Sequence, residues 1–295
     1  MRKAMVTGSE GQVGKYLCNS LNDLGIEVVR FDQRLGNDVR DYESVRNFVD
    51  SNSPDAIFHL AAQAYVPESS FNPHRGIDVN VKGTLNILDA VRETGQSSYI
   101  QLAGTSEEYG YDRDDISLSE LSVCQPTTPY GVSKLAATNL GLVYNRMYGM
   151  NVVCTRAWNH FGPGTSAIYA TSAFAKRIAR AEKYGEPVVH GNLEAIRNYS
   201  DVRDIVKAYI SLIGKSGIYN LASSRNASIR DVLDILIGMS KTEIQVEGNP
   251  NLFRPQSNKF PNPSTEKIKK EIGWETRIEL ETTLEETLEY WRRNV

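Results

Sequence analysis

A tyrosine and a lysine stand four residues apart in the segment Tyr130-Gly131-Val132-Ser133-Lys134. On a helix, residues at this spacing share one face. A nearby ammonium favours the phenolate, so we expect Lys134 to lower the pKa of the Tyr130 phenol from about 10 toward neutrality. Such a phenol can take a proton from an alcohol, or return one, while hydride moves at the same carbon. The spacing therefore predicts acid–base chemistry coupled to hydride transfer.

A pair at this spacing is commonly a solvated helix face, and its context here argues for chemistry instead. The pair begins a predicted helix directly after Pro126 and Pro129. It also follows a predicted strand that ends in Thr105-Ser106-Glu107. A strand end with a hydroxyl and a carboxyl group is expected to face the same site as the tyrosine.

A glycine-rich turn joins the first predicted strand to the first predicted helix, in Thr7-Gly8-Ser9-Glu10-Gly11-Gln12-Val13-Gly14. The first glycine permits a tight turn, the second lets backbone approach a pyrophosphate, and the third allows close packing of helix on strand. The helix N-terminus adds free N–H groups and the positive end of a dipole. This context predicts a dinucleotide site. The expected contacts in the turn are Gly8, Glu10, Gly11, Gln12, Val13 and Gly14.

An acidic residue, Asp32, ends the second predicted strand about 20 residues past the glycines. A carboxylate there accepts both ribose hydroxyls of NAD and repels the additional phosphate of NADP. Arg30 and Arg34 favour NADP instead, because either guanidinium can bind that phosphate. We expect NAD or NADP, with NAD favoured by Asp32. Asp38 and Val39 follow at a distance that suits an adenine contact, although a surface loop accounts for them equally well.

Composition excludes several classes of function. The 295 residues carry a net charge of −3 without a basic stripe, so we expect no nucleic-acid partner. The three cysteines fit neither a disulfide framework nor a zinc site, and we predict no metal. No signal core is recognisable near the N-terminus, and no apolar run approaches the about 20 residues of a membrane span. We expect a cytoplasmic protein without a membrane partner.

Short apolar runs alternate with helical patterns along the first two thirds of the chain. Predicted strands lie at residues 4–6, 27–31, 56–60, 98–102, 152–155 and 218–221. Predicted helices lie at residues 13–24, 42–52, 79–93, 130–148, 204–213 and 280–293. This alternation predicts an α/β fold with a Rossmann-type, doubly wound parallel sheet.

The pattern loosens after about residue 157, where glycine and proline become frequent. We therefore predict a smaller C-terminal α/β substrate domain. The dinucleotide-binding domain is expected to comprise residues 1–157 and about 198–222. The substrate domain is expected to comprise about 158–197 and 223–295.

The chain resembles the short-chain dehydrogenase/reductase superfamily in the order of three features. These are the glycine turn, the hydroxyl at a strand end and the tyrosine–lysine pair. The resemblance implies that Thr105 binds the substrate oxygen, that Tyr130 is the acid/base, and that Lys134 holds the nicotinamide ribose. The segment His59-Leu60-Ala61-Ala62 is similar to the one that lines the cofactor in extended members, and Asn80 matches their helix-bending asparagine. The further cofactor contacts that the resemblance implies are Leu60, Ala61, Ala62 and Asn80.

Downstream motifs resemble the nucleotide-sugar branch, closest to GDP-mannose 4,6-dehydratases and GDP-4-keto-6-deoxymannose reductases. They are 106–110, 129–134, Asn159-His160-Phe161-Gly162-Pro163-Gly164 and 191–197. The resemblance implies a GDP-sugar substrate and a homodimer formed through helices 79–93 and 130–148. Because a diphosphate suits forked, permanent cations, arginines are expected among its ligands. The substrate contacts that the resemblance implies are Gln63, Thr105, Ser106, Glu107, Asn159, Lys176, Arg197 and Arg254.

Two reactions compete for this site. A 4,6-dehydratase needs a second acid/base, and Glu107, two residues past Thr105 in an extended segment, would point to the same side. The triplet Thr105-Ser106-Glu107 and the residue Gln63 resemble the dehydratases, whereas the short chain and the motif at 159–164 resemble the reductases. We expect a 4,6-dehydratase acting on GDP-mannose, because Glu107 has a chemical task in that reaction. The alternative is a 4-ketoreductase, and a nucleotide-sugar epimerase is third.

A different class of protein is a catalytically silent, dinucleotide-binding regulator on the same fold. Loss of Thr105, Tyr130 or Lys134 would favour it. All three are present. The sequence therefore favours an enzyme.

Overall fold

The structure is a computed structural model that describes residues 1–110, 117–252 and 262–295. Its larger part is a six-stranded sheet in the order β10-β6-β4-β3-β1-β2, and every neighbouring pair of strands is parallel. The strands are β1 (Lys3–Thr7), β2 (Glu27–Phe31), β3 (Ala56–His59), β4 (Tyr99–Thr105), β6 (Val152–Ala157) and β10 (Gly217–Leu221). Strand order reverses at β1, which makes this the predicted doubly wound sheet.

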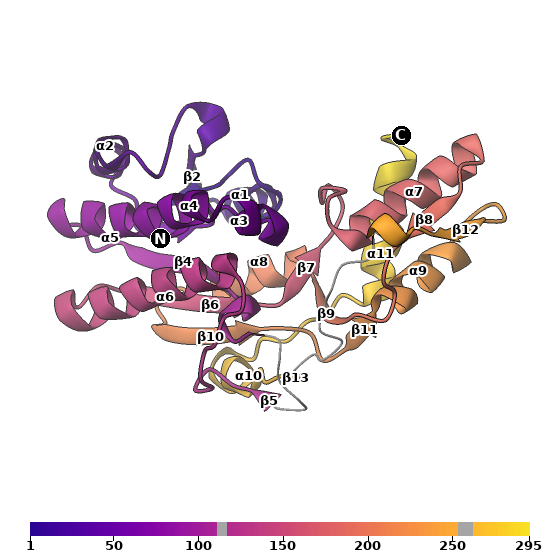
Figure 1. The fold of residues 1–295 in the computed structure, drawn as a ribbon. Coiled ribbons are helices and arrows are strands. Elements are labelled where there is room, and N and C mark those ends of the chain that lie inside the picture. The colour runs from indigo at the N-terminus through magenta and orange to yellow at the C-terminus, as the bar shows by residue number, and fades with distance from the viewer. Residues whose placement is uncertain (111–116, 253–261) are drawn as a thin grey trace.

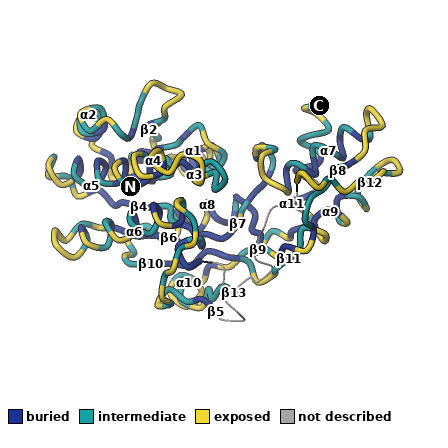
Figure 2. The backbone as a smooth tube through the Cα atoms, viewed as in Figure 1, coloured by how far each residue is buried: buried dark blue, intermediate teal, exposed yellow. Residues whose placement is uncertain are grey.

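Helices cover both faces of the sheet because side chains alternate along each strand. Ala4 and Val6 of β1 pack in one buried cluster with residues of α1 and α8, and Met5 packs on the opposite face with residues of α2 and α5. The covering helices are α1 (Gln12–Asp23), α2 (Tyr42–Asn52), α5 (Gly83–Glu93), α6 (Pro129–Tyr148) and α8 (Val202–Ser211). Figure 2 shows β4 and β6 as buried strands, with exposed positions on α5 and α6.

Local signals at the ends of α6 explain why this helix begins and stops where the sequence predicts. The Thr128 side chain accepts a hydrogen bond from the Gly131 N–H, and Pro129 occupies the first turn. Gly149 ends the helix with a φ of 65°, a left-handed conformation that glycine adopts without strain. The helix therefore presents Tyr130 in its first turn.

A smaller part of the molecule gathers around a second core and lies at the right of Figure 1. Its three-stranded sheet has the order β11-β9-β7, and its two-stranded sheet pairs β12 with β8. Helices α7 (Ala170–Tyr184), α9 (Ile229–Gly238) and α11 (Leu280–Arg292) pack on this core. The strands are β7 (Asn159–Phe161), β8 (Val188–His190), β9 (Ile196–Asp201), β11 (Asn226–Ser228) and β12 (Val246–Gly248).

The chain crosses between the two parts more than once. Within the predicted stretch 198–222, β9 belongs to the smaller sheet, whereas α8 and β10 return to the large one. The helix α10 (Glu266–Ile272) also packs under the large sheet, through Ile268 and the following Trp274. The predicted two-domain division and the homodimer stay predictions.

The sequence missed the short helical elements that follow the strand ends. After β3 the chain forms α3 (Val66–Phe71), α4 (Pro73–Gly76) and a π-helix, η2 (Ile77–Lys82), before α5 begins. Short 3₁₀ turns, η1 (Gln33–Leu35) and η3 (Ser106–Glu108), follow β2 and β4. The remaining short elements are β5 (Ser117–Leu118), η4 (Pro250–Leu252) and β13 (Asn262–Pro263). Within the described ranges, no helix has the length and apolar character that a membrane span requires.

The contact between α1 and the turn after β1 gives the first testable prediction. A Cβ on Gly14 would lie 2.2 Å from the Gly8 carbonyl oxygen and 2.8 Å from the Ser9 Cα, and backbone cannot move aside as a side chain tip does. Gly14→Ala is expected to lower the free energy of unfolding by about 1–3 kcal/mol, measured by urea denaturation. Gly238→Ala is the matched control.

Gly238 ends α9, and a Cβ there meets nothing within 4 Å. Its replacement is expected to leave stability unchanged or raise it by up to about 1 kcal/mol, since alanine favours helix. Equal effects of the two replacements would contradict the close approach of α1 to the turn.

Candidate functional site

A cavity of about 1350 Å³ opens at the carboxyl ends of the parallel strands. Its walls come from the loops that follow β1, β2, β3, β4 and β6, from the first turn of α6, and from β7, β9 and the start of α7. Ligands of doubly wound folds bind at this edge of the sheet. A drug-sized ligand occupies about 300–1,000 Å³, so this cavity has room for more than one such molecule.

The structure brings most of the predicted site residues to this cavity. They are Gly8, Glu10, Gly11, Gln12, Val13, Gly14, Asp32, Arg34, Asp38, Val39, Leu60, Ala61, Ala62, Gln63, Thr105, Ser106, Glu107, Tyr130, Asn159 and Arg197. Asn80 and Lys134 are buried beneath its wall. Lys176 lies elsewhere, and Arg254 falls outside the described residues.

The glycine turn forms a close-fitting cradle at one end of the cavity. Gly8 has a φ of 68°, and a Cβ on it would lie 2.8 Å from the Ala61 nitrogen. Gly11 precedes the first turn of α1 and makes no side-chain cap, so the N–H groups of that turn are available to an anion. Backbone approach and a helix N-terminus together fit a dinucleotide pyrophosphate.

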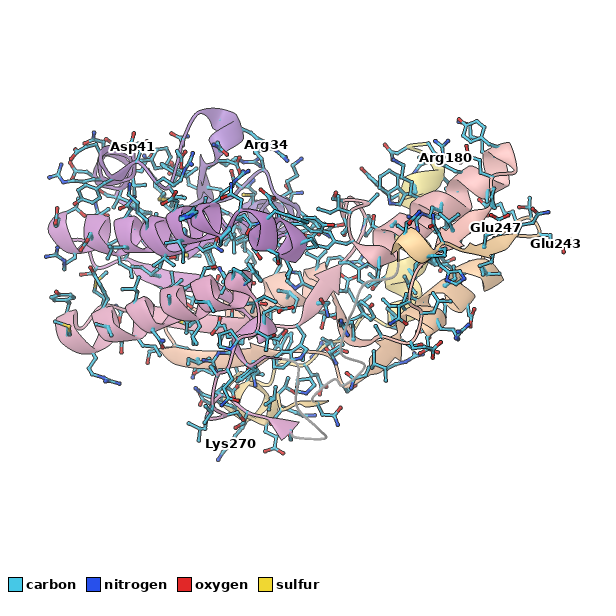
Figure 3. All side chains as sticks on the ribbon, viewed as in Figure 1. Arg34, Asp41, Arg180, Glu243, Glu247 and Lys270 are labelled. Atoms are coloured by element: carbon cyan, nitrogen blue, oxygen red, sulfur yellow. The ribbon has the colours of Figure 1, made fainter. Side chains whose placement is uncertain are left out.

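Charged groups at the end of β2 are linked to this turn. The Asp32 carboxylate accepts hydrogen bonds from the N–H groups of Glu10 at 3.0 Å and Arg34 at 2.9 Å. The Arg34 guanidinium donates to the Glu10 carbonyl at 2.9 Å, and Arg30 forms an ion pair with the Glu10 carboxylate at 2.9 Å. Figure 3 shows Arg34 on the N-terminal part of the molecule, far from Arg180 on the smaller part. Asp32, Arg30 and Arg34 therefore lie together beside Glu10 of the glycine turn.

The floor of the cavity next to the cradle is formed by the segment after β3. The Thr7 hydroxyl accepts from the N–H groups of Leu60 and Ala61, both at 3.1 Å. The same hydroxyl lies 2.8 Å from Nδ1 of His59, whose Nε2 lies 3.1 Å from the Thr84 hydroxyl. Burial lowers the pKa of His59 to about 3. His59 is therefore a neutral, hydrogen-bonded core residue.

Asp38 and Val39 line the far end of the cavity. The Asp38 carboxylate pairs with Arg40, whose Nε lies 3.0 Å from each oxygen, and this hydrogen-bonded pairing holds the pKa of Asp38 below its usual range. Val39 is buried against α5, where a Cβ on Gly83 would lie 2.8 Å from its Cγ2. These residues are part of the wall and not of a free surface loop.

Thr105 and Tyr130 meet at the centre of the cavity. Thr105 ends β4, Tyr130 lies in the first turn of α6, and both side chains line the cavity, close enough for Thr105 to influence the phenol. Burial is the main influence on the phenol and raises its pKa, the Thr105 hydroxyl opposes this rise, and the nearby charge of Glu107 adds to it. The protein's own groups therefore raise the pKa of Tyr130 and hold the phenol protonated, and the lowering toward neutrality stays a prediction for the protein with its dinucleotide.

Lys134 is enclosed in the same part of the molecule. Its side chain is buried, and burial lowers the pKa of the ammonium to about 8, while the Glu108 carboxylate raises it. Burial thus favours the neutral amine of Lys134, whereas the Glu108 carboxylate favours the charged ammonium. The helix still places Lys134 one turn beyond Tyr130, beneath the cavity wall.

Glu107 lines the cavity, but not through the extended geometry that the sequence predicts. Residues Ser106–Glu108 form a 3₁₀ turn capped by Thr105, whose hydroxyl accepts from the Glu107 N–H at 3.3 Å. A hydroxyl group at a strand end competes for the next N–H groups in this way and turns the chain. The Thr128 hydroxyl donates to the Glu107 carboxylate at 3.4 Å.

Asn80 does not line the cavity and instead joins its wall to α6. Its side-chain oxygen accepts from the Gln63 N–H at 2.8 Å, and its amide donates to the Ser133 hydroxyl at 2.9 Å. Ser133 donates in turn to the Tyr130 carbonyl at 2.7 Å. Asn80 therefore bridges two walls of the cavity, and its predicted cofactor contact stays a prediction.

The predicted substrate contacts divide into two groups. Asn159 of β7 and Arg197 of β9 line the cavity on the side of the smaller sheet. Lys176 does not line the cavity, because its ammonium lies over the Trp291 ring, 4.9 Å from the centroid. The sequence analysis did not predict the helix α7, so it gave no indication of the side to which Lys176 turns.

Aromatic residues of the cavity wall were not predicted from the sequence. Tyr169 precedes α7 and packs edge-on against Tyr65, with ring centroids 6.0 Å apart, and Tyr199 of β9 and Trp158 also line the wall. Trp158 directly precedes the motif at 159–164, and this position in the sequence was the one signal that could have indicated it as a wall residue. No sequence pattern after residue 157 indicated Tyr169 as a wall residue.

Comparisons with known proteins agree with this geometry. A sequence model of the family described as GDP-mannose 4,6 dehydratase matches residues 35–287. The chain belongs to that family. It is thereby a member of the nucleotide-sugar branch of the extended short-chain dehydrogenases/reductases, as predicted.

Relatives of the family carry several activities. A GDP-6-deoxy-D-mannose reductase of Pseudomonas aeruginosa is 29% identical over 300 residues, covering 100% of this chain and 98% of the relative. A GDP-mannose 4,6-dehydratase of Sordaria araneosa is 26% identical, covering 97% of this chain and 60% of the relative. The family membership therefore does not by itself select one reaction.

Solved structures reproduce the whole fold. The structure of RMD from Pseudomonas aeruginosa complexed with NADPH has a TM-score of 0.91 at 27% identity, with 100% of both chains covered. The UDP-glucose 4-epimerase of Thermus thermophilus in complex with NAD has a TM-score of 0.88 at 26% identity, covering 99% of this chain and 100% of that one. The chain is an NAD(P)-dependent nucleotide-sugar enzyme, and the cradle described above fits such a cofactor.

Proposed function

We propose that this family member is an NAD(P)H-dependent 4-ketoreductase of a GDP-linked 4-keto-6-deoxyhexose. The observation that carries the proposal is that Thr105 and Tyr130 line one cavity together with the glycine turn, with the phenol held protonated by burial. A protonated phenol is the form that a carbonyl reduction requires, since the product oxygen must receive a proton. The end-to-end match with a GDP-6-deoxy-D-mannose reductase supports the same choice over the dehydratase that the sequence favoured.

The residues of the chain divide the reaction between them. Thr105 donates a hydrogen bond to the substrate carbonyl and holds it beside Tyr130. A reduced nicotinamide dinucleotide held by the glycine turn would supply the hydride for the sugar C4. Tyr130 would give its proton to the carbonyl oxygen as that hydride arrives, and Lys134 would stabilise the phenolate left behind. The sugar would thereby gain two hydrogens, one as the hydride and one as the Tyr130 proton.

The nucleotide end of the substrate is assigned to the smaller-sheet side of the cavity. Arg197 and Asn159 line that side, and a guanidinium suits a diphosphate. GDP is the nucleotide favoured by the family and by the names of the relatives cited above. We assign these two residues to the diphosphate and nucleotide.

A second candidate is the GDP-mannose 4,6-dehydratase reaction, favoured by one observation. Glu107 lines the same cavity as Tyr130 and lies close enough to influence its charge. After oxidation at C4, a carboxylate so placed can remove the C5 proton and return it to the departing C6 hydroxyl. The two candidates therefore differ in whether Glu107 takes part.

Tyr130→Phe tests the role of the phenol. Reduction of a GDP-4-keto-6-deoxyhexose by NADH or NADPH, followed by nicotinamide absorbance, is expected to fall at least about 100-fold. Dinucleotide affinity should stay within a few-fold. Tyr148→Phe, an exposed tyrosine on the same helix, is the matched control. Near-normal turnover by Tyr130→Phe would rule out the proposed acid.

Glu107→Gln separates the two candidate reactions. If the chain is a reductase, the variant keeps ketoreduction within a few-fold, and neither protein converts GDP-mannose. If the chain is a dehydratase, the unaltered protein forms a 4-keto sugar from GDP-mannose, and the variant loses at least about 100-fold of that rate. Mass spectrometry of the nucleotide sugars distinguishes loss of water from gain of two hydrogens.

Asp32→Asn tests the choice of dinucleotide, for which we infer a preference for NAD. The replacement removes the negative charge, while its side-chain oxygen still accepts from the Arg34 N–H. The affinity ratio is expected to move toward NADP by about tenfold, which equals about 1.4 kcal/mol. Fluorescence titration with NADH and NADPH measures the ratio. An unchanged ratio would remove Asp32 from the ribose site.

A further inference from the structure

Glu10 of the glycine turn is bonded to both arginines near the end of β2. Its carboxylate pairs with the Arg30 guanidinium at 2.9 Å, and its carbonyl accepts from the Arg34 guanidinium at 2.9 Å. Its N–H donates to the Asp32 carboxylate at 3.0 Å. Two acids and two permanent cations are thus joined through one residue of the turn, beside the acid that is predicted to bind the ribose.

These four groups differ in their access to the cavity. Glu10, Asp32 and Arg34 line it, and Arg30 does not. Arg30 lies on β2, and Asp32 continues that strand with extended backbone angles, φ −151° and ψ 146°. Side chains two residues apart on an extended segment point to the same side. The Glu10 carboxylate therefore holds the Arg30 guanidinium outside the cavity, on the side to which Asp32 points.

The stability of the fold does not account for this ion pair. The side chains of Arg30 and Glu10 are 38% and 20% exposed, and a pair in contact with solvent contributes little to folding. Its place beside the predicted ribose acid has a clearer consequence, because a guanidinium is the group that best matches a phosphate. While the Glu10 carboxylate occupies this guanidinium, it is withheld from a phosphate.

The balance of charge at this corner decides whether the bound ribose can carry a phosphate. NADP differs from NAD by one phosphate on the adenosine ribose. The carboxylate of Asp32 offsets the guanidinium of Arg34, and both line the cavity. The carboxylate of Glu10 offsets the guanidinium of Arg30. Together the four groups offer the additional phosphate no net positive charge.

We propose that Glu10 determines specificity for NAD over NADP, by holding Arg30 and cancelling its charge. The residue acts at the ribose and takes no part in hydride transfer. The inference rests on the proposed preference for NAD and deepens it, since Asp32 by itself leaves two arginines that favour NADP. Binding of the dinucleotide to the whole protein tests it without a sugar substrate.

Glu10→Gln removes the charge that holds Arg30 and keeps a side chain of the same size. Dissociation constants of NADH and NADPH are measured by fluorescence titration in about 0.1 M salt. Their ratio is expected to move toward NADPH by about five- to tenfold, because the guanidinium is released and the repelling carboxylate is gone. In about 1 M salt the shift should shrink to within about twofold, since salt screens exposed charges. A shift that salt leaves unaltered would contradict the electrostatic role.

Arg30→Gln makes the opposite change of charge. It leaves the Glu10 carboxylate unpaired beside the ribose, so the ratio is expected to move toward NADH by about five- to tenfold. The double replacement removes both charges and should return the ratio to within about threefold of the wild type, as expected for two coupled groups. A double variant that keeps the whole shift of Glu10→Gln would overturn the proposal, because the shift would then be independent of Arg30.

Glu27→Gln is the matched control. Glu27 also lies on β2 and pairs with a cation, Lys3 of β1, at 3.1 Å. The replacement changes the charge of the chain by the same amount at the opposite end of the strand. The length of β2 exceeds the screening distance of about 10 Å at 0.1 M salt, so the ratio should stay within about twofold. An equal shift from Glu27→Gln would overturn the proposal.

The outcomes separate this inference from the proposed function. If Asp32→Asn moves the ratio and Glu10→Gln does not, the preference for NAD stands and this inference fails. A wild type that binds NADPH more tightly than NADH would overturn both. Failure of the wild type to reduce a keto sugar would overturn the proposed reaction alone, since the binding ratios require no sugar.

Discussion

The Glu108 carboxylate is the contact on which the catalytic wall depends, because β4, β6 and α6 each donate a hydrogen bond to it. An unpaired buried charge costs several kcal/mol, so the fold must bring Arg156 to this anion whenever it forms. Breaking such a pair by removing one partner costs about 3–5 kcal/mol. The same requirement that stabilises the fold therefore also fixes Thr105 against the first turn of α6.

The cofactor end of the site is shaped by close approach of backbone segments, whereas the catalytic end is held by a buried ion pair. Gly8 and Gly14 let the turn after β1 and the start of α1 approach within contact distance of each other and of Ala61. An anion there meets N–H groups and the positive end of a helix, and not a field of lysines. This explains how a chain with a net charge of −3 can be built to hold a dinucleotide together with a nucleotide diphosphate.

Reductases, dehydratases and epimerases of this branch share one oxidation–reduction step at the sugar carbon. In the proposed reaction, the hydroxyl of Thr105 and the phenol of Tyr130 serve that step, and both line the cavity. The two candidate reactions differ in the need for a further acid or base, and Glu107 lines the same cavity from a capped 3₁₀ turn. The role of Glu107 is therefore what separates the two candidates on a shared fold.

The sequence by itself determined the six strands of the doubly wound sheet and the helices that cover it, because alternating and helical periodicities record which faces are buried. Its motifs also indicated the family. It also indicated the glycine turn, Asp32, Thr105 and Tyr130, since strand ends of a parallel sheet meet at one edge. Only the tertiary structure decided the charge state of Tyr130, the bridging place of Asn80 and the position of Lys176. Those depend on burial and on partners distant along the chain, such as Glu108 with Arg156 and Lys176 with Trp291, and local spacing carries no record of them.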